Sequence, residues 1–296
     1  MTSWNERSIV AQRGRTFVVT GATSGLGEAT ARALGRSGAQ VILAVRDLDA
    51  GEEVARQIGS NADVRKLDLS NLESIASFAS AIDQIDVLIN NAGVMAVPLK
   101  RTSDGFELQM GTNHLGHFAL TGQLLECVRD RIVTVSSSFH AYGNIDLDDL
   151  NWHARPYNRW LAYAQSKLAN LMFAYELQRR LSAAGSAVRS VAAHPGYSAT
   201  GLQGHTESLQ DRVMALGNLV IAQNARAGAL PTLFAATEPD VQRGGYYGPQ
   251  GMFGMRGTPG PARSTRASRD EHISRELWDL SESLTSVKYS FSGLLA

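Results

Sequence analysis

The chain has 296 residues, of which 44% are hydrophobic, and its 28 basic and 28 acidic side chains cancel. This length and composition suit an α/β protein with a substantial core, and the balanced charge gives no reason to expect nucleic acid or an anionic membrane as a partner. The single cysteine, Cys127, excludes an intrachain disulfide, and no apolar run approaches the roughly 20 residues of a membrane span, so we expect a cytoplasmic protein.

From residue 16 onward, short β-branched runs alternate with longer helical patterns, which favours parallel strands joined by crossover helices. Strands are predicted at residues 16–20, 41–45, 64–69, 86–90, 131–135 and 187–193, with a short seventh around 246–247. Helices are predicted at residues 28–37, 48–58, 72–82, 105–128, 159–181, 225–236 and 271–280. A Pro-, Ser- and Arg-rich stretch, residues 258–269, is expected to be loose and exposed. The pattern predicts one doubly wound parallel sheet of about seven strands with helices on both faces, in a single domain over residues 1–296.

A glycine-rich turn follows the first predicted strand directly. Gly21, Gly25 and Gly27 stand at the spacing G-x-x-x-G-x-G between a strand and a helix. Glycines at this junction let the backbone approach a pyrophosphate, and a helix N-terminus offers free N–H groups and the positive end of its dipole. The turn therefore indicates a dinucleotide site, and the alternative is an ordinary glycine-containing turn.

The end of the second predicted strand bears on which dinucleotide is bound. Arg46 stands about 20 residues past the glycine turn, where the ribose of a dinucleotide arrives, and Val45 occupies the place of an NAD-type acid. A guanidinium complements a 2′-phosphate, whereas a carboxylate accepts hydrogen bonds from a free 2′-hydroxyl. Asp47 is explained more simply as the N-cap of the following helix. We therefore expect NADP in preference to NAD.

Two further strand ends carry candidate cofactor contacts. Asp68 and Leu69 close the third strand, where Asp68 either reaches an adenine amino group or caps the next helix. Asn90, Ala92 and Gly93 close the fourth strand, and their small or amide side chains leave room for the nicotinamide ribose. The sequence thus predicts a ligand edge at the carboxyl ends of the strands.

The long helical pattern over residues 105–128 contains Asn113, His114 and His117. Two histidines three apart are a weak metal motif, and no further ligand spacing near them supports a metal site. An asparagine inside a helix is the more unusual feature. Three serines, 136–138, follow the fifth strand, and residues 139–160 form a long connection that we expect to be an irregular surface excursion.

Tyr163 and Lys167 stand four positions apart in the helix predicted at residues 159–181, which places both side chains on one helix face. A free tyrosine has a pKa of about 10, and a nearby cation lowers it. We expect Lys167 to bring the pKa of Tyr163 toward neutrality, so that the phenol exchanges a proton with a carbonyl or alcohol. An amphipathic helix with a solvent-facing lysine is the alternative.

Taken together, these motifs resemble the short-chain dehydrogenases/reductases over nearly the whole chain. The run from Thr20 to Gly27, with Ser24 and Leu26, is similar to the family's cofactor motif, and residues 90–93 and Tyr163 with Lys167 are similar to two others. Pro195 and Thr200 resemble the family's segment after the sixth strand. Residues 113–118, 150–152 and 166–170 look most like the retinol dehydrogenase and WW-domain oxidoreductase branch.

The resemblance implies a Rossmann-type fold with a dinucleotide-binding part over residues 14–200 and a substrate-covering part over 197–296. It implies a catalytic set in which Asn113 holds a relay water, Ser137 binds the substrate oxygen, Tyr163 is the acid/base, and Lys167 also binds the nicotinamide ribose. The implied reaction is hydride transfer between nicotinamide and the carbonyl or alcohol carbon of a hydrophobic small molecule. The resemblance also allows a homo-oligomer, because many relatives pair through the two long helices.

Two rival functions remain open at this stage. A dinucleotide-binding regulatory protein would share the fold without turnover, because fold does not dictate function. A sugar-nucleotide epimerase or dehydratase would usually show the glycine spacing G-x-x-G-x-x-G instead. The apolar patch at residues 214–222 is either a substrate lid or a packed helix, and the pattern does not decide between them.

Overall fold

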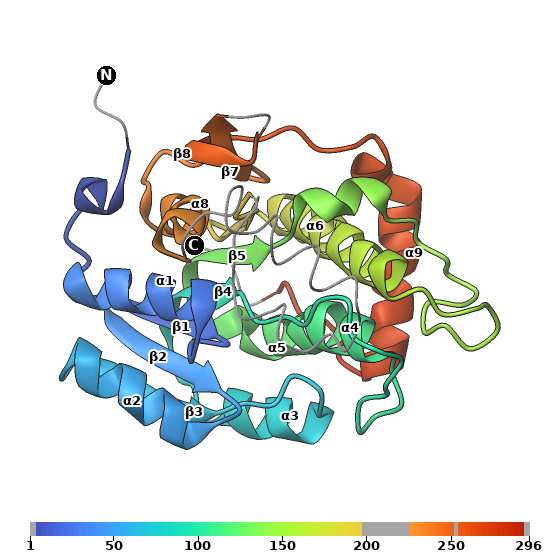
Figure 1. Cartoon of the computed structure of the whole chain (residues 1–296), viewed down its shortest axis with the longest axis horizontal. Coiled ribbons are helices and arrows are strands. Elements are labelled where there is room, and N and C mark those ends of the chain that lie inside the picture. Colours follow the sequence, from blue (N-terminus) through green and yellow to red (C-terminus); the bar gives the residue numbers. More distant parts are fainter. Residues whose placement is uncertain (1–3, 197–224, 252–253, 293–296) are drawn as a thin grey trace, which may run out of the picture.

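The computed structural model describes residues 4–196, 225–251 and 254–292. Its strands form one eight-stranded sheet in the order β3-β2-β1-β4-β5-β6-β7-β8 (Figure 1). The strands are β1 Thr16–Thr20, β2 Gln40–Val45, β3 Ala62–Lys66, β4 Ile85–Asn90, β5 Val128–Val135, β6 Arg189–Ala193, β7 Tyr246–Gly251 and β8 Arg256–Pro261. All neighbours are parallel except β7 and β8. The doubly wound parallel sheet is confirmed, with one strand more than the sequence predicted.

The helices lie on both faces of this sheet, as predicted. They are α1 Gly25–Arg36, α2 Leu48–Ile58, α3 Leu72–Ser80, α4 Leu108–Met110, α5 Gly116–Leu124, α6 Arg159–Ala183, α8 Ala225–Thr237 and α9 Glu271–Thr285. Shorter turns are η1 Glu6–Ser8, η2 Gly111–Leu115, η3 Leu125–Cys127, η4 Ser138–Tyr142 and η7 Ala267–Arg269. Among the helices of the described residues, none is both long enough and apolar enough to cross a membrane.

The extra strand, β8, comes from the segment that the sequence predicted to be loose. It pairs antiparallel with β7, with Tyr247 opposite Pro261 and Pro249 opposite Pro259. Proline cannot donate to a strand ladder, so it is tolerated at the edge of a sheet, which is where β8 lies. The prolines and glycines of this segment predicted a loop from sequence, although it forms an edge strand.

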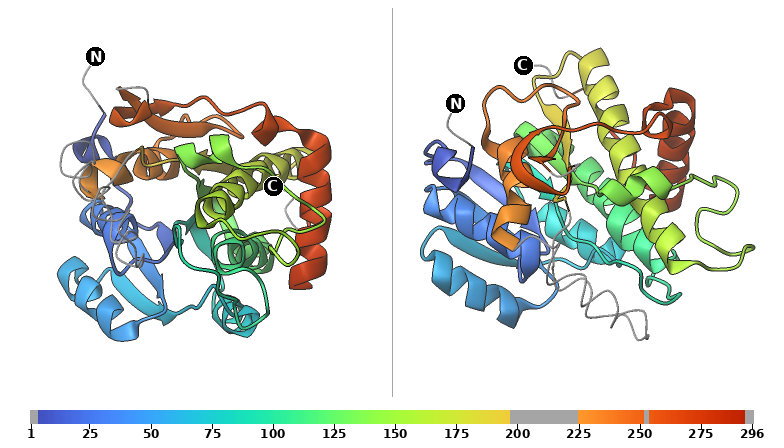
Figure 2. Two further views of the ribbon diagram at one scale, coloured as in Figure 1. Left: turned by 45° about the vertical axis from the view of Figure 1, so that its right-hand side comes forward. Right: turned by 45° about the horizontal axis from the view of Figure 1, so that its top comes forward.

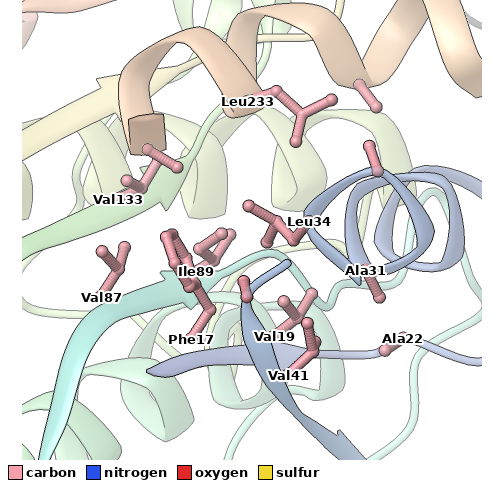
Figure 3. Close-up of a cluster of buried hydrophobic side chains, with 14 of the residues drawn as sticks. Phe17, Val19, Ala22, Ala31, Leu34, Val41, Val87, Ile89, Val133 and Leu233 are labelled. Carbon is pink, nitrogen blue, oxygen red and sulfur yellow. The ribbon is translucent and has the colours of Figure 1, made fainter. Parts of the chain in front are cut away.

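Side chains that alternate along the strands build a core on each face of the sheet. Phe17 and Val19 point to one face, where α1, α2 and α8 cover them, and Figure 3 shows Leu34 of α1 and Leu233 of α8 meeting this layer. Val18, between them in β1, points to the opposite face, which is covered by α3, α5 and α6. This period of two fixes the sheet between two helical layers.

The C-terminal helix α9 packs outside α5 and α6 (Figures 1 and 2). Its Trp278 is buried, with ring centroids 5.0 Å from Phe118 of α5 and 5.8 Å from Phe173 of α6. The following segment closes the same cluster, because Tyr289 lies 4.4 Å from the Trp278 ring and donates its hydroxyl to the Phe118 carbonyl at 2.7 Å. The chain's own C-terminal part therefore covers this face of the two helices.

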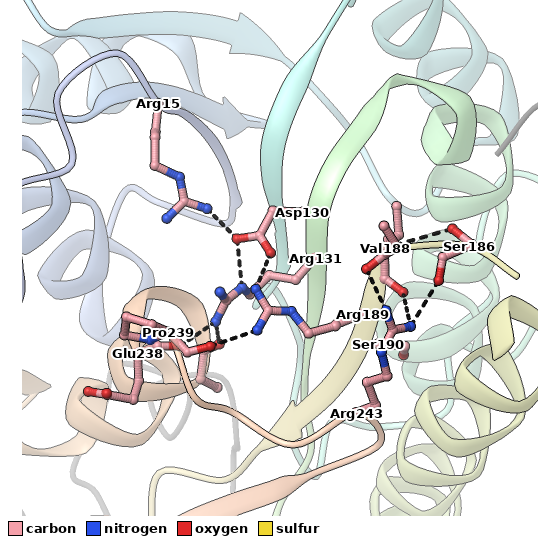
Figure 4. Close-up of polar contacts among 12 residues, drawn as sticks. Arg15, Asp130, Arg131, Ser186, Val188, Arg189, Ser190, Glu238, Pro239 and Arg243 are labelled. Atoms are coloured by element: carbon pink, nitrogen blue, oxygen red, sulfur yellow. Dashed lines mark hydrogen bonds and ion pairs between the residues drawn. The ribbon is translucent and has the colours of Figure 1, made fainter. Parts of the chain in front are cut away.

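A charged cluster ties the amino ends of the strands together (Figure 4). Asp130 of β5 is paired with Arg15, Arg131 and Arg189. Burial raises the pKa of Asp130, but the guanidiniums of Arg131 and Arg189 outweigh it and hold the pKa below its usual value. This cluster lies at the sheet edge opposite to the carboxyl ends of the strands.

The connection between η4 and α6 is irregular, as expected, but it is not simply a surface excursion. Leu150 and Trp152 are buried, and Arg155 lies over the Trp152 ring at 3.8 Å. Asn151 accepts a hydrogen bond from the Glu107 amide at 2.9 Å. The segment is thus packed against the start of α4.

Candidate active site

A cavity of ≈ 290 Å³ opens at the carboxyl ends of β1, β2, β4 and β5. This is the edge at which open α/β sheets bind ligands. The site residues predicted from sequence that line it are Gly21, Ser24, Gly25, Leu26, Gly27, Arg46, Asp68, Leu69, Ala92, Gly93, Tyr163, Lys167 and Pro195. Thr200 and residues 214–222 lie outside the described residues.

The glycine turn is shaped so that side chains do not fit. Gly21 has φ +66°, and a Cβ there would lie 2.8 Å from the Cβ of Ala92. Gly27, at the start of α1, would place a Cβ 2.2 Å from the Gly21 carbonyl oxygen and 2.5 Å from Asn91 Nδ2. The helix N-terminus therefore sits directly on the strand-end turn, and at these two glycines the backbone is open to the cavity. This cradle fits a pyrophosphate.

The corner of the cavity beyond β2 is basic. Arg46 is exposed and lines the cavity, and Lys66 donates its Nζ to the Arg46 carbonyl at 2.6 Å. Asp47 accepts from the Ala50 amide at 3.0 Å, so its predicted role as the N-cap of α2 is confirmed. The guanidinium is thus available to a ligand, whereas the neighbouring carboxylate is engaged by its own helix.

Asp68 does not cap α3, so that alternative is wrong. The cap is Asn71, which accepts from the amides of Glu73 and Ser74. Asp68 instead accepts from the amide and hydroxyl of Ser70, at 2.9 and 2.6 Å, while it also lines the cavity. Because β3 ends at Lys66, two residues earlier, a local Asx turn rather than the strand presents this carboxylate.

Asn90 differs from the other predicted contacts because it is buried behind the cavity. Its Nδ2 donates to Thr121 Oγ1 at 2.9 Å, and it is not among the lining residues. The next residue, Asn91, lines the cavity and donates its Nδ2 to the Thr20 carbonyl at 2.8 Å. In this doublet the second amide faces the ligand side, and sequence reasoning missed it because nothing local distinguishes the two.

Tyr163 and Lys167 lie on one face of α6, at the cavity. Ser137 follows β5, and a hydrogen bond of its side chain to Tyr163 acts to lower the phenol pKa. Ser136 lines the cavity, but its hydroxyl donates to the Lys167 carbonyl at 2.7 Å, and Ser138 is exposed at the start of η4. Of the three serines, Ser137 is therefore the one placed beside the tyrosine.

The expected lowering of the Tyr163 pKa is not what the structure shows. Burial raises the pKa of Tyr163 to about 12, against the smaller opposing effect of the Ser137 hydrogen bond. Burial also lowers the pKa of Lys167 to about 8. The Lys167 Nζ donates to the Val135 carbonyl at 3.1 Å and lies 5.8 Å from the Tyr163 ring centroid. The ammonium is thus directed toward the end of β5 rather than onto the phenol oxygen.

Asn113 lies in an interruption of the predicted 105–128 helix. Residues Gly111–Leu115 form a π-turn between α4 and α5, and such turns are frequent at functional sites. The fully buried Asn113 accepts from the Val94 amide at 2.8 Å, and its Nδ2 donates to the Val94 carbonyl and to Ser166 Oγ, both at 2.9 Å. It therefore joins the loop after β4 to the helix that carries Lys167.

A glycine cradle for a dinucleotide beside a tyrosine, a lysine and a serine at the carboxyl edge of a parallel sheet defines a class of protein. It is a nicotinamide-dependent oxidoreductase acting on alcohol and carbonyl groups.

Comparison with known proteins identifies the family. Residues 15–211 match the short chain dehydrogenase model, and retinol dehydrogenase 13 of Homo sapiens is 38% identical over 294 residues, covering 93% of this chain and 86% of that one. Retinol dehydrogenase 12 of Homo sapiens is 44% identical over 216 residues, covering 69% and 67% of the two chains. The chain therefore belongs to the short-chain dehydrogenase/reductase family, in the branch that contains the retinol dehydrogenases.

Solved structures agree with this fold. A protein of uncharacterized function from Mycobacterium paratuberculosis is 49% identical, with a TM-score of 0.86, and the match covers 98% of this chain and 100% of that one. The 3-ketoacyl-(acyl-carrier-protein) reductase of Brucella melitensis, solved with NADH, is 23% identical, with a TM-score of 0.62 over 79% of this chain and 96% of that one, and shows the fold alone.

Proposed function

We propose that the chain is an NADP-preferring oxidoreductase that transfers a hydride between the nicotinamide and the carbonyl or alcohol carbon of a hydrophobic small molecule, with Tyr163 as the acid/base. The observation that carries the proposal is the meeting of Tyr163, Lys167 and the glycine cradle in one cavity. The cofactor supplies the hydride when it is bound. The chain's own residues bind it, orient the substrate and move the proton.

The proton is handled at the Tyr163 hydroxyl. In reduction, this hydroxyl gives its proton to the substrate oxygen as the carbonyl carbon gains the hydride; in oxidation it takes the proton back. Ser137 donates a second hydrogen bond to the same substrate oxygen and stabilises the charge that develops there. Lys167, whose Nζ lies 5.8 Å from the Tyr163 ring centroid, would bind the nicotinamide ribose and so hold the cofactor beside the phenol. Asn113 would hold the relay water through its backbone carbonyl, because its side chain is engaged by Val94 and Ser166.

The preference for NADP rests on the basic corner of the cavity. Arg46 is exposed there, and Lys66 adds a second positive charge next to the Arg46 backbone carbonyl. A 2′-phosphate would accept charge-assisted hydrogen bonds from the guanidinium, whereas the adjacent acid, Asp47, is occupied as a helix cap. Asp68 and Leu69 would contact the adenine end, and Ala92, Gly93 and Pro195 the nicotinamide end.

The hydrophobic character of the substrate rests on an aromatic wall beside Tyr163. The Phe139 ring lies 5.8 Å from each of the rings of Tyr163, Trp160 and Tyr142, measured between centroids. Tyr142 is 72% exposed, so part of this wall faces outward. Exposed aromatic surface next to a reactive group favours an apolar ligand. The retinol dehydrogenases to which the chain is similar are named for such a substrate.

We place the enzyme in a reducing compartment, the cytoplasm, because its single cysteine is a free, half-buried thiol.

Replacing Tyr163 by Phe tests the proposal. The Tyr163→Phe variant keeps the ring contacts with Phe139 but removes the proton, so we expect turnover of apolar aldehydes or ketones to fall by a factor of about 100 to 10,000, while NADPH still binds. Tyr175→Phe is the matched control, because Tyr175 lies on the same helix and bonds Ser264 Oγ at 3.0 Å. Turnover near the wild-type rate in Tyr163→Phe would remove the tyrosine from this role.

A further inference from the structure

The two histidines of η2 and α5 face in different directions. His114 Nε2 lies 3.0 Å from Ser281 Oγ of α9, whereas His117 Nε2 lies 2.9 Å from Thr20 Oγ1 at the end of β1. Both are buried, with 2% and 1% of their surface exposed. Only His117 therefore touches the strand end that carries the glycine turn, and the proton transfer described above leaves it without a role.

The hydrogen bonds around His117 fix its tautomer. Its Nδ1 lies 3.0 Å from the Asn113 carbonyl oxygen, and since a carbonyl only accepts, Nδ1 carries the hydrogen. Thr20 Oγ1 accepts from the amides of Asn91 and Ala92, both at 2.9 Å, which uses its two lone pairs. The Thr20 hydroxyl can then only donate its own hydrogen. His117 Nε2, at 2.9 Å, is a nearer acceptor for it than the Ile89 carbonyl at 3.4 Å.

The charges around this ring also favour the neutral form. Burial lowers the pKa of His117 to about 4, the Asn113 carbonyl opposes this effect, and the charge of Lys167 adds to it. His114, the other titratable group near it, has a pKa lowered to about 3 by burial. The ring therefore stays uncharged through the neutral pH range, and its two nitrogens keep their separate donor and acceptor roles.

His117 thereby completes a buried chain of hydrogen bonds across the site. It begins at Thr20, which holds the loop after β4, and passes through His117 to the Asn113 carbonyl. The Asn113 side chain continues it to Ser166 Oγ, next to Lys167 in α6. The chain thus connects the strand end at the cofactor cradle with the helix that carries the catalytic pair.

We propose that His117 is a positioning residue, which holds the π-turn of Asn113 in register with the cofactor cradle by bonding the Asn113 carbonyl on one side and Thr20 on the other. This inference rests on the proposed function for its effect on turnover. It extends that function by giving a buried histidine a role in setting the geometry of the relay.

Three substitutions separate the two bonds. His117→Asn keeps a donor near the position of Nδ1 but loses the hydrogen bond to Thr20. His117→Gln keeps a polar group near the position of Nε2 but loses the hydrogen bond to the Asn113 carbonyl. His117→Phe loses both hydrogen bonds. We expect kcat to fall by about 100-fold in His117→Phe, as misplacement by about 1 Å does elsewhere, with the substrate KM changing by less than about threefold. We expect the NADPH Kd to rise by about 2- to 10-fold, because Thr20 loses its acceptor.

His114→Phe is the matched control, since it removes an equally buried histidine three residues earlier in the chain, one that bonds α9 instead of Thr20. It should lower stability while leaving kcat and the NADPH Kd near wild type. If His114→Phe lowers kcat as much as His117→Phe does, the effect is one of general packing and the proposal is overturned. Compared with His117→Phe, a higher kcat in His117→Asn and a higher NADPH affinity in His117→Gln would support separate roles for the two ring nitrogens.

A readout without cofactor or substrate keeps the inference separate from the proposed function. In the ligand-free protein, the amides of Asn91 and Ala92 should exchange hydrogen about 5- to 10-fold faster in His117→Phe than in wild type. Thr20→Val removes the oxygen that accepts from both amides, so it should raise exchange at least as much, and adding His117→Phe to it should have no further effect. Unchanged exchange in His117→Phe would contradict the proposal. If exchange responds but wild type turns over no carbonyl compound, the proposed function fails and the link through His117 stands. Should His117→Phe not fold, Thr20→Val and His117→Asn carry the same comparison.

Discussion

Gly27 gives the sharpest test of the cofactor cradle, because its backbone φ is one that any residue can adopt. Only the lack of space for a Cβ atom requires glycine at this position. A Cβ at Gly27 would lie 2.2 Å from the Gly21 carbonyl oxygen, and separations under 3.0 Å are essentially never found, so Gly27→Ala must move the start of α1 by at least 0.8 Å. Such overpacking costs about 1–3 kcal/mol of stability. The displaced helix end also loses one charge-assisted bond to the pyrophosphate, worth about 1.5–3 kcal/mol, so we expect NADPH affinity to fall about 10- to 100-fold.

Gly35→Ala is the control for this substitution because it lies in the same helix. Its Cβ would lie 2.4 Å from Ile58 Cγ2, a methyl group at the end of a side chain that can rotate, and not from the backbone of the turn. Fluorescence titration with NADPH and urea unfolding of both variants provide the comparison, and both should remain folded. Wild-type NADPH affinity in Gly27→Ala would show that the cradle tolerates a side chain at this position, and an equal loss of affinity in Gly35→Ala would show that the effect is not specific to the turn.

Further predictions concern the cofactor, the acid side of the stability profile and self-association. Arg46→Ala should weaken NADPH binding by about 1.5–3 kcal/mol more than NADH binding, measured by parallel titrations; equal losses would indicate a structural role. Burial lowers the pKa of three histidines to about 3 or 4, so unfolding by urea should become easier as pH falls from about 6.5 to 4, by roughly 3 kcal/mol per histidine, because the unfolded chain binds the protons first. These histidines are His114, His117 and His194. Flat stability across this range would contradict their neutral burial. Because α9 and Tyr289 cover the outer face of α5 and α6, we expect no dimer through that face. A wild-type dimer, detected by light scattering and broken by substitutions on α5, would refute this. Tyr289→Ala should lower the free energy of unfolding by about 3–5 kcal/mol.

The parts of the structure that follow from short-range chemistry were predictable from the sequence. The bounds of β1 and α2 match their predictions, since β-branched runs, glycines and the Asp47 cap act locally. The cavity lining at the glycine turn and at Tyr163 follows from the same signals, because a parallel sheet brings its strand ends to one edge.

The features that were missed depend on contacts between distant segments. The π-turn at Asn113 has the apolar pattern of a continuous helix, and what distinguishes it is the bonding of Asn113 to Val94 and Ser166. The raised pKa of Tyr163 depends on its burial, which residue spacing does not report. The strand β8 was hidden by prolines that are acceptable only because the strand lies at an edge.

Under the proposed function, this chain moves a hydride from a nicotinamide to a carbonyl carbon. The most direct test is to incubate the purified protein with NADPH deuterated at nicotinamide C4, on each face in turn, and with a panel of apolar aldehydes and ketones, with deuterated NADH in parallel. We expect alcohol products that carry one deuterium on the former carbonyl carbon, formed faster with NADPH, and none above background with Tyr163→Phe. Products without deuterium from either face, or no product with either cofactor, would contradict it.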